Sequence, residues 1–178
     1  EQKVVKPIGY RSGVYKVLKE VPNVPVFSVQ RELVNPFKLY YPRDVDRQIE
    51  LDFAENVVLR EGDLILISGL SNYGKTCIAL NFLAENLEYE PVLMGNEYTN
   101  LDQAPTPRFL SRLSNIDWVT WLTEDGKDRF TLLPVHDDHA EYVVKDKINI
   151  IDWINIESGE HFMIGNILKD IKKNVGKG

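Results

Sequence analysis

The sequence predicts an α/β protein in which helices flank a mainly parallel sheet, preceded by a β-hairpin and an extended linker. From about residue 47 onward, short apolar runs alternate with helical patterns, as in βαβ units. Before that point, residues 3–19 alternate polar and apolar positions around a glycine-containing turn, and four prolines interrupt the segment that follows. We therefore divide the chain into a hairpin (1–20), a linker (21–46) and an α/β core (47–178).

The core contains the elements from which a parallel sheet is built. Continuous apolar runs suit buried parallel strands, and apolar residues recurring every three or four positions suit helices. Expected strands are 64–69, 91–95 and 148–152, with shorter β-prone runs at 118–122 and 129–135, and expected helices are 75–87, 106–115 and 159–174. Thr106 and Pro107 form a typical helix start, as N-cap and first helical residue. The linker is expected to pack through Phe37, Leu39, Tyr40 and Tyr41.

The stretch GLSNYGKT, residues 69–76, has the spacing G-x-x-x-x-G-K-[ST] of a phosphate-binding loop. Gly69 and Gly74 allow the backbone to curl so that its N–H groups point at phosphates, and the following helix adds its positive end. Lys75 supplies a cation for the β and γ phosphates, and the Thr76 hydroxyl can ligate Mg²⁺. The nucleotide contacts predicted from this motif are Gly69, Ser71, Asn72, Tyr73, Gly74, Lys75, Thr76 and Cys77.

Two acids complete the predicted site. Asp152 ends the apolar run 148–152, and Glu97 follows the run 91–95. In parallel sheets, ligands bind at the carboxyl ends of the strands, so both side chains are expected at one edge. Asp152 would hold Mg²⁺ through water, and Glu97 would act with Lys75 in catalysis by activating the attacking water.

The segment GDLILISGLSNYGKTCIALNFLAEN resembles the Walker A region of RecA-like ATPases, particularly the replicative DNA helicase (DnaB-type) branch. The stretch VLMGNEYTN and the following PRFLSRL are similar to the next strand and helix of that branch, and INIIDWINI resembles its Walker B strand. The resemblance covers about residues 50–174. It implies a RecA-like fold, ATP and Mg²⁺ as cofactors, Glu97 as catalytic glutamate, Asp152 as Walker B acid, and a hexamer with an arginine finger from a neighbouring subunit. Tyr73 is bulkier than the residue usual before the GK pair.

The N-terminal hairpin resembles the wing of a winged-helix domain whose preceding helices are missing. In that interpretation Lys6, Arg11 and Lys16 contact DNA phosphates, which position a protein without reading sequence. The alternative is a hairpin that packs on the core or serves as a tether. The resemblances favour an ATPase of a DNA-associated protein acting in replication, as a helicase or helicase loader, in a phage or mobile element.

Composition limits the other classes. A net charge of −6 argues against a protein that coats nucleic acid generally, although it allows local basic contacts. No apolar run is long enough to span a membrane, and the single cysteine, Cys77, fits a reducing cytoplasmic compartment. The start at Glu1 and the end soon after a helical pattern favour a piece of a larger protein. A nucleotide-binding switch with little turnover and a P-loop small-molecule kinase are the alternative functions.

Overall fold

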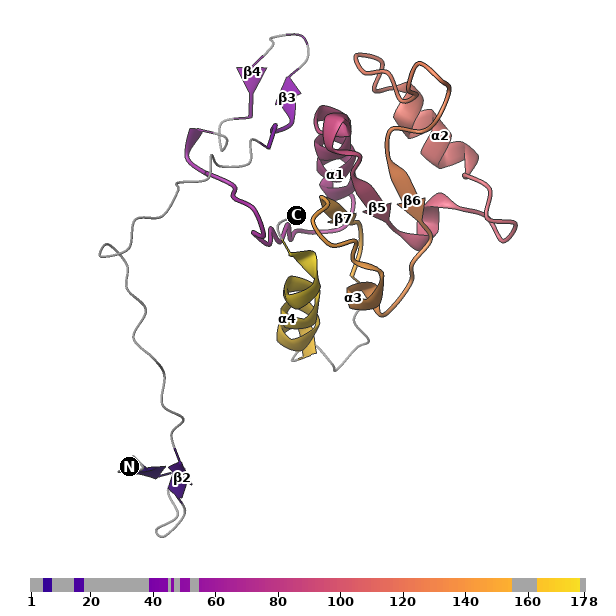
Figure 1. Cartoon of the computed structure of the whole chain (residues 1–178). Helices are drawn as coiled ribbons and strands as arrows, with labels where there is room; N and C mark the ends of the chain where they lie inside the picture. Colours follow the sequence, from indigo (N-terminus) through magenta and orange to yellow (C-terminus); the bar gives the residue numbers. More distant parts are fainter. Residues whose placement is uncertain are drawn as a thin grey trace. The chain divides into compact units, whose positions relative to one another are not determined.

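The computed structural model of the chain describes residues 5–7, 15–17, 39–44, 46, 49–51, 55–154 and 163–176. The chain forms two compact units, Glu1–Asn35 and Pro36–Gly178, which we describe separately (Figure 1). In the first unit, β1 (Val5–Pro7) pairs antiparallel with β2 (Tyr15–Val17), and Lys6 lies opposite Lys16 in the register. The predicted hairpin is confirmed. Arg11, in the expected turn, lies outside the described residues.

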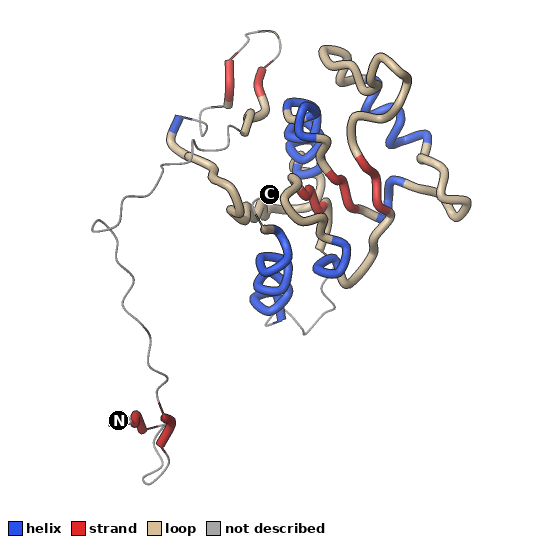
Figure 2. The backbone as a smooth tube through the Cα atoms, viewed as in Figure 1, coloured by secondary structure: helices blue, strands red, loops and turns tan. Residues whose placement is uncertain are grey.

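The second unit is built on a three-stranded parallel sheet. Its order is β6 (Thr131–Leu133), β5 (Val92–Met94) and β7 (Asn149–Ile151), with β5 in the centre (Figure 2). All three residues of β5 are buried, which suits a strand covered on both faces. This confirms the predicted α/β core with a parallel sheet. A separate antiparallel pair joins β3 (Arg43–Asp44) to β4 (Ile49–Glu50).

Helices flank the sheet, and α1 and α2 begin within one residue of the predicted starts, whereas the first residues of the helix expected at 159–174 lie outside the described residues. The α-helices are α1 (Lys75–Glu85), α2 (Pro107–Ser114), α3 (His139–Tyr142) and α4 (Ile164–Val175), and the 3₁₀ turns are η2 (Leu87–Tyr89) and η3 (Asn96–Tyr98). Thr106 caps α2 as expected, because its Oγ1 accepts a hydrogen bond from the Phe109 N–H at 3.2 Å. The short helix α3 was not predicted, since four residues are too few to show a helical period.

The core lies on both faces of the sheet. On one face, Leu80 and Leu83 of α1 pack with Leu93 of β5 and with Phe109 and Leu113 of α2. On the other face, Val92 and Met94 pack with Val135, beside Leu133 and Ile151. Successive residues of β5 therefore point to opposite sides, and α1 and α2 share the face that contains Leu93.

The predicted strand at 64–69 is wrong. Residues 63–70 have no regular secondary structure, and the side chains of Leu64, Ile65, Leu66 and Ile67 are 41–59% exposed. Among the described residues, β7 pairs only with β5, so its other edge has no strand beside it. An apolar run indicates where a strand can form, but pairing depends on a distant partner that the run itself does not specify. The run 118–122 likewise forms no strand, and only an isolated bridge joins Leu122 to Asp128.

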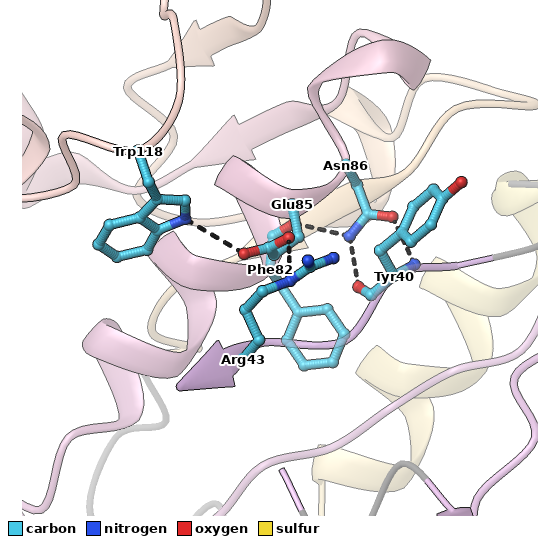
Figure 3. A network of polar contacts seen from close by, with 6 residues as sticks. All are labelled: Tyr40, Arg43, Phe82, Glu85, Asn86 and Trp118. Atoms are coloured by element: carbon cyan, nitrogen blue, oxygen red, sulfur yellow. Dashed lines mark hydrogen bonds and ion pairs between the residues drawn. The ribbon is translucent and has the colours of Figure 1, made fainter. Parts of the chain in front are cut away.

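The end of the expected linker packs on the last turn of α1 (Figure 3). The side chain of Asn86 accepts a hydrogen bond from the Tyr40 N–H at 2.9 Å and donates to the carbonyls of Tyr40 and Phe82 at 2.7 and 2.8 Å. Arg43 Nε lies 3.0 Å from Glu85 Oε2, while Glu85 Oε1 accepts from the Trp118 indole at 3.2 Å. Of the residues expected to pack, Tyr41 is buried and its ring lies 5.8 Å from that of Phe82.

Candidate functional site

The loop 69–76 leads into α1 through two residues in the left-handed region. Asn72 has φ 65° and Gly74 has φ 83°, a conformation that favours glycine at position 74. Gly69 does not have a positive φ, and a Cβ there would meet nothing within 4 Å, so this structure shows no comparable need for glycine. Helix α1 begins at Lys75, and its first bond joins the Ile78 N–H to the Gly74 carbonyl at 2.9 Å. The amides of the first turn have no partner within the helix and can bind an anion.

Lys75 is folded back onto the loop that precedes it. Its ammonium donates hydrogen bonds to the carbonyls of Gly69 and Leu70, at 2.8 and 2.7 Å. These bonds join the end of the loop to its beginning and hold the positive charge of Lys75 against it. A phosphate entering the loop would therefore meet this charge as well as the end of α1.

The two predicted acids lie beyond the carboxyl ends of neighbouring parallel strands. Glu97 is in η3, just after β5, and Asp152 directly follows β7. The Asp152 N–H donates to the Met94 carbonyl at 3.0 Å, which continues the pairing of β7 with β5 by one residue. Glu97 is exposed, whereas Asp152 is only 8% exposed. The sheet thus brings both acids to the same edge, as the sequence predicts.

Tyr98 holds the carboxylate of Asp152. Its side chain is fully buried, and its hydroxyl donates a hydrogen bond to Asp152 Oδ2. Burial, reinforced by this bond and by the charge of Asp152, raises the pKa of Tyr98, so the hydroxyl stays protonated and remains a donor. No cation of the described part of the chain forms an ion pair with Asp152. A buried carboxylate with one neutral donor keeps its negative charge available to a ligand.

A pocket of about 1100 Å³ brings these groups together. Both Glu97 and Asp152 line it, and so do seven of the eight residues predicted to contact nucleotide: Gly69, Ser71, Asn72, Gly74, Lys75, Thr76 and Cys77. Tyr73 is not among the lining residues and is 77% exposed. Two arginines of α2, Arg108 and Arg112, also line the pocket. Residues four positions apart lie on the same side of a helix, so the spacing of Arg108 and Arg112 in the sequence could have predicted that both reach the pocket.

The donor set fits Mg²⁺ held mainly by water and phosphate. Within the described residues, no group of three or more His, Cys, Asp or Glu side chains could hold a metal by itself. Mg²⁺ retains several waters and is usually bound by one or two protein oxygens together with substrate phosphates. The Thr76 hydroxyl and the buried Asp152 carboxylate suit that role, and both line the pocket with the loop.

Comparison with known proteins adds no relative. No protein-family model, curated protein or solved structure matches the chain. In the described ranges, no helix is both long enough and apolar enough to cross a membrane.

Proposed function

We propose that the second unit is a RecA-like P-loop ATPase that binds ATP with Mg²⁺ and hydrolyses it. The observation that carries this proposal is the pocket in which Lys75 and Thr76 of the loop share a surface with Glu97 and Asp152. Lys75 would bind the β and γ phosphates, together with the first amides of α1, and the Asp152 and Thr76 oxygens would hold Mg²⁺. When bound, Mg²⁺ neutralises charge on the phosphates.

Glu97 would supply the base. Its carboxylate is exposed and lines the pocket, so a water can reach it. The water oxygen forms a bond to the γ-phosphorus while the bond to the bridging oxygen of ADP breaks, and Glu97 accepts the proton that the water releases. ADP and phosphate are the products. Arg108 and Arg112 provide further positive charge on the same pocket wall.

The loop lysine gives the sharpest test. We expect Lys75→Ala to weaken ATP binding by about 10- to 100-fold, because hydrogen bonds to charged groups contribute about 1.5–3 kcal/mol. Lys127→Ala is the matched control, since Lys127 is exposed and its ammonium pairs with Asp125 at 2.5 Å, away from the lining residues. Equal ATP affinity of the two variants would refute the nucleotide site.

The second acid distinguishes hydrolysis from binding alone. Glu97→Gln should retain ATP affinity while turnover falls by about 10²–10⁴-fold, the contribution typical of a positioned base. If the wild-type chain binds ATP tightly without turnover, the alternative function of a nucleotide-binding switch is favoured. Transfer of phosphate to a metabolite would favour the alternative of a small-molecule kinase.

We further propose that the ATPase belongs to a DNA-associated, oligomeric replication protein, as the resemblance implies. The hairpin supports a DNA contact, because Lys6 and Lys16 lie opposite each other in its register. Replacing Lys6, Arg11 and Lys16 together by alanine should reduce the slope of log affinity for DNA against log salt by about one unit for each phosphate that is no longer bound. If the salt dependence of DNA affinity is unchanged, the hairpin does not contact DNA phosphates, and the alternative that it serves as a tether is favoured.

A further inference from the structure

Tyr98 links the Asp152 carboxylate to α2, and we propose that it is a positioning residue that orients Asp152 for Mg²⁺. This inference rests on the proposed function of the pocket. Tyr98 and Asp152 lie 54 positions apart in the sequence and meet through the Tyr98 hydroxyl and Asp152 Oδ2. No other side chain of the described residues hydrogen-bonds to the carboxylate.

The hydrogen bond fixes one oxygen of the carboxylate and leaves the other for a ligand. The main chain of Asp152 is already held by its N–H bond to the Met94 carbonyl. The remaining freedom is rotation of the side chain, which the Tyr98 hydroxyl restricts. Because Asp152 also lines the pocket, its second oxygen, Oδ1, can accept from a water bound to Mg²⁺.

The tyrosine ring is itself held from two sides. It packs against Phe109 of α2 with ring centroids 4.5 Å apart. At the end of β5, Gly95 leaves the space that the ring occupies, since a Cβ at Gly95 would lie 2.7 Å from Tyr98 Cε2. The backbone at Gly95 is extended, a conformation that any residue can adopt. Glycine is therefore needed here for the space it leaves and not for its backbone freedom. The ring cannot move without disturbing α2 or the end of β5.

A neutral donor suits this role better than a cation. A lysine or arginine at this place would cancel the charge of Asp152 and compete with Mg²⁺ for it. The tyrosine hydroxyl satisfies the buried oxygen and leaves the negative charge in place. Hydrogen bonds of this kind to metal-binding groups orient them, and their loss typically costs about 10–100-fold in metal affinity or activity.

The test removes only the hydroxyl. We expect Tyr98→Phe to bind a non-hydrolysable ATP analogue in EDTA with affinity within about twofold of wild type. Its affinity for Mn²⁺ in the presence of that analogue, measured by electron paramagnetic resonance, should fall about 10-fold. The Mg²⁺ concentration for half-maximal hydrolysis should rise equally, and saturating Mg²⁺ should restore turnover. Tyr89→Phe, at the opposite end of β5, is the matched control and should leave all three values unchanged.

A double-mutant cycle separates positioning from general packing. If Tyr98 acts through Asp152, Tyr98→Phe should cause no further loss of Mn²⁺ affinity in an Asp152→Asn background. Gly95→Ala provides a second variant that keeps both polar groups; its Cβ would lie 2.7 Å from Tyr98 Cε2 and 3.3 Å from the Asp152 carbonyl, and it should weaken Mn²⁺ binding as Tyr98→Phe does.

The possible outcomes distinguish this inference from the proposed function. An unchanged Mn²⁺ affinity in folded Tyr98→Phe would overturn the positioning role while leaving the ATPase intact. An equal further loss in the Asp152→Asn background would overturn it as well, because Tyr98 would then act elsewhere. If the wild-type chain binds no ATP analogue, the proposed function is wrong and the positioning role fails with it.

Discussion

Asn86 at the end of α1 should be a major determinant of the stability of the second unit. Its side chain is 1% exposed and makes three hydrogen bonds, two of them to the backbone of Tyr40 (Figure 3). Each such bond makes a net contribution of about 0.5–1.5 kcal/mol. Replacing Asn86 by alanine removes all three, so we expect the free energy of unfolding to fall by about 2–4 kcal/mol.

Urea unfolding measures this loss directly. With a slope of about 2 kcal/mol per molar urea, a loss of about 3 kcal/mol lowers the midpoint by about 1.5 M at constant slope. Asn81→Ala is the matched control on the same helix. Asn81 donates exposed hydrogen bonds to the Cys77 carbonyl at 2.8 Å and to Cys77 Sγ at 3.5 Å, and their loss should change stability by about 0.5 kcal/mol at most.

The comparison of the two asparagines can refute the reasoning. If Asn86→Ala and Asn81→Ala unfold at the same urea concentration, the contact between residues 39–44 and α1 contributes no net stability. A changed slope for Asn86→Ala would show instead that the substitution changes the compactness of the native or denatured state, or that unfolding is no longer two-state.

Three further predictions concern single contacts. Burial lowers the pKa of His139 from 6.5, so the folded state binds a proton at this side chain less readily than the unfolded state does. The wild-type protein should therefore lose stability relative to His139→Phe as pH falls below 6.5. A difference in unfolding free energy that does not change with pH would contradict this. The hydrogen bond from Lys147 and the positive charge of Lys147 lower the pKa of Glu90 from 4.5. In Lys147→Met, titration of the Glu90 carboxyl group followed by NMR should show its pKa rising toward 4.5. The stabilisation from that pair is present above pH 4.5 and disappears as pH falls through the lowered pKa. Thr106→Ala should cost about 1 kcal/mol through loss of the cap on α2, and a thermal midpoint equal to wild type would argue against it.

Local signals predicted the elements they directly specify. Thr106 and Pro107 determine the start of α2 through chemistry within one helical turn, and the structure has α2 at Pro107–Ser114. The apolar run ending at Asp152 predicted a strand with an acid at its carboxyl end. In the structure this run forms β7, which pairs parallel with β5. These features depend on short-range rules that one sequence can show.

Long-range contacts were the part that one sequence could not supply. The strand expected at 64–69 fails because pairing needs a partner edge, and apolar character alone does not provide one. The contact between Tyr98 and Asp152 joins positions 54 residues apart, and nothing in the stretch GNEY marks its tyrosine as a partner of a distant acid. Gly95 beside Tyr98 was the nearest signal, because a glycine at a strand end often leaves room for a neighbouring group.

Helix α1 connects the loop to the rest of the second unit and therefore determines how the site responds to its surroundings. Its first residue is Lys75, its last turn adjoins Asn86, and its middle packs through Leu80 in the cluster that contains Leu93 of β5. An 11-residue helix moves as a rigid rod of about 16 Å, so a shift of the contact at one end must act on the loop at the other. Asn86→Ala should then weaken ATP affinity relative to the wild-type chain. Equal affinities would show that the packing of α1 on β5 alone holds Lys75 in place.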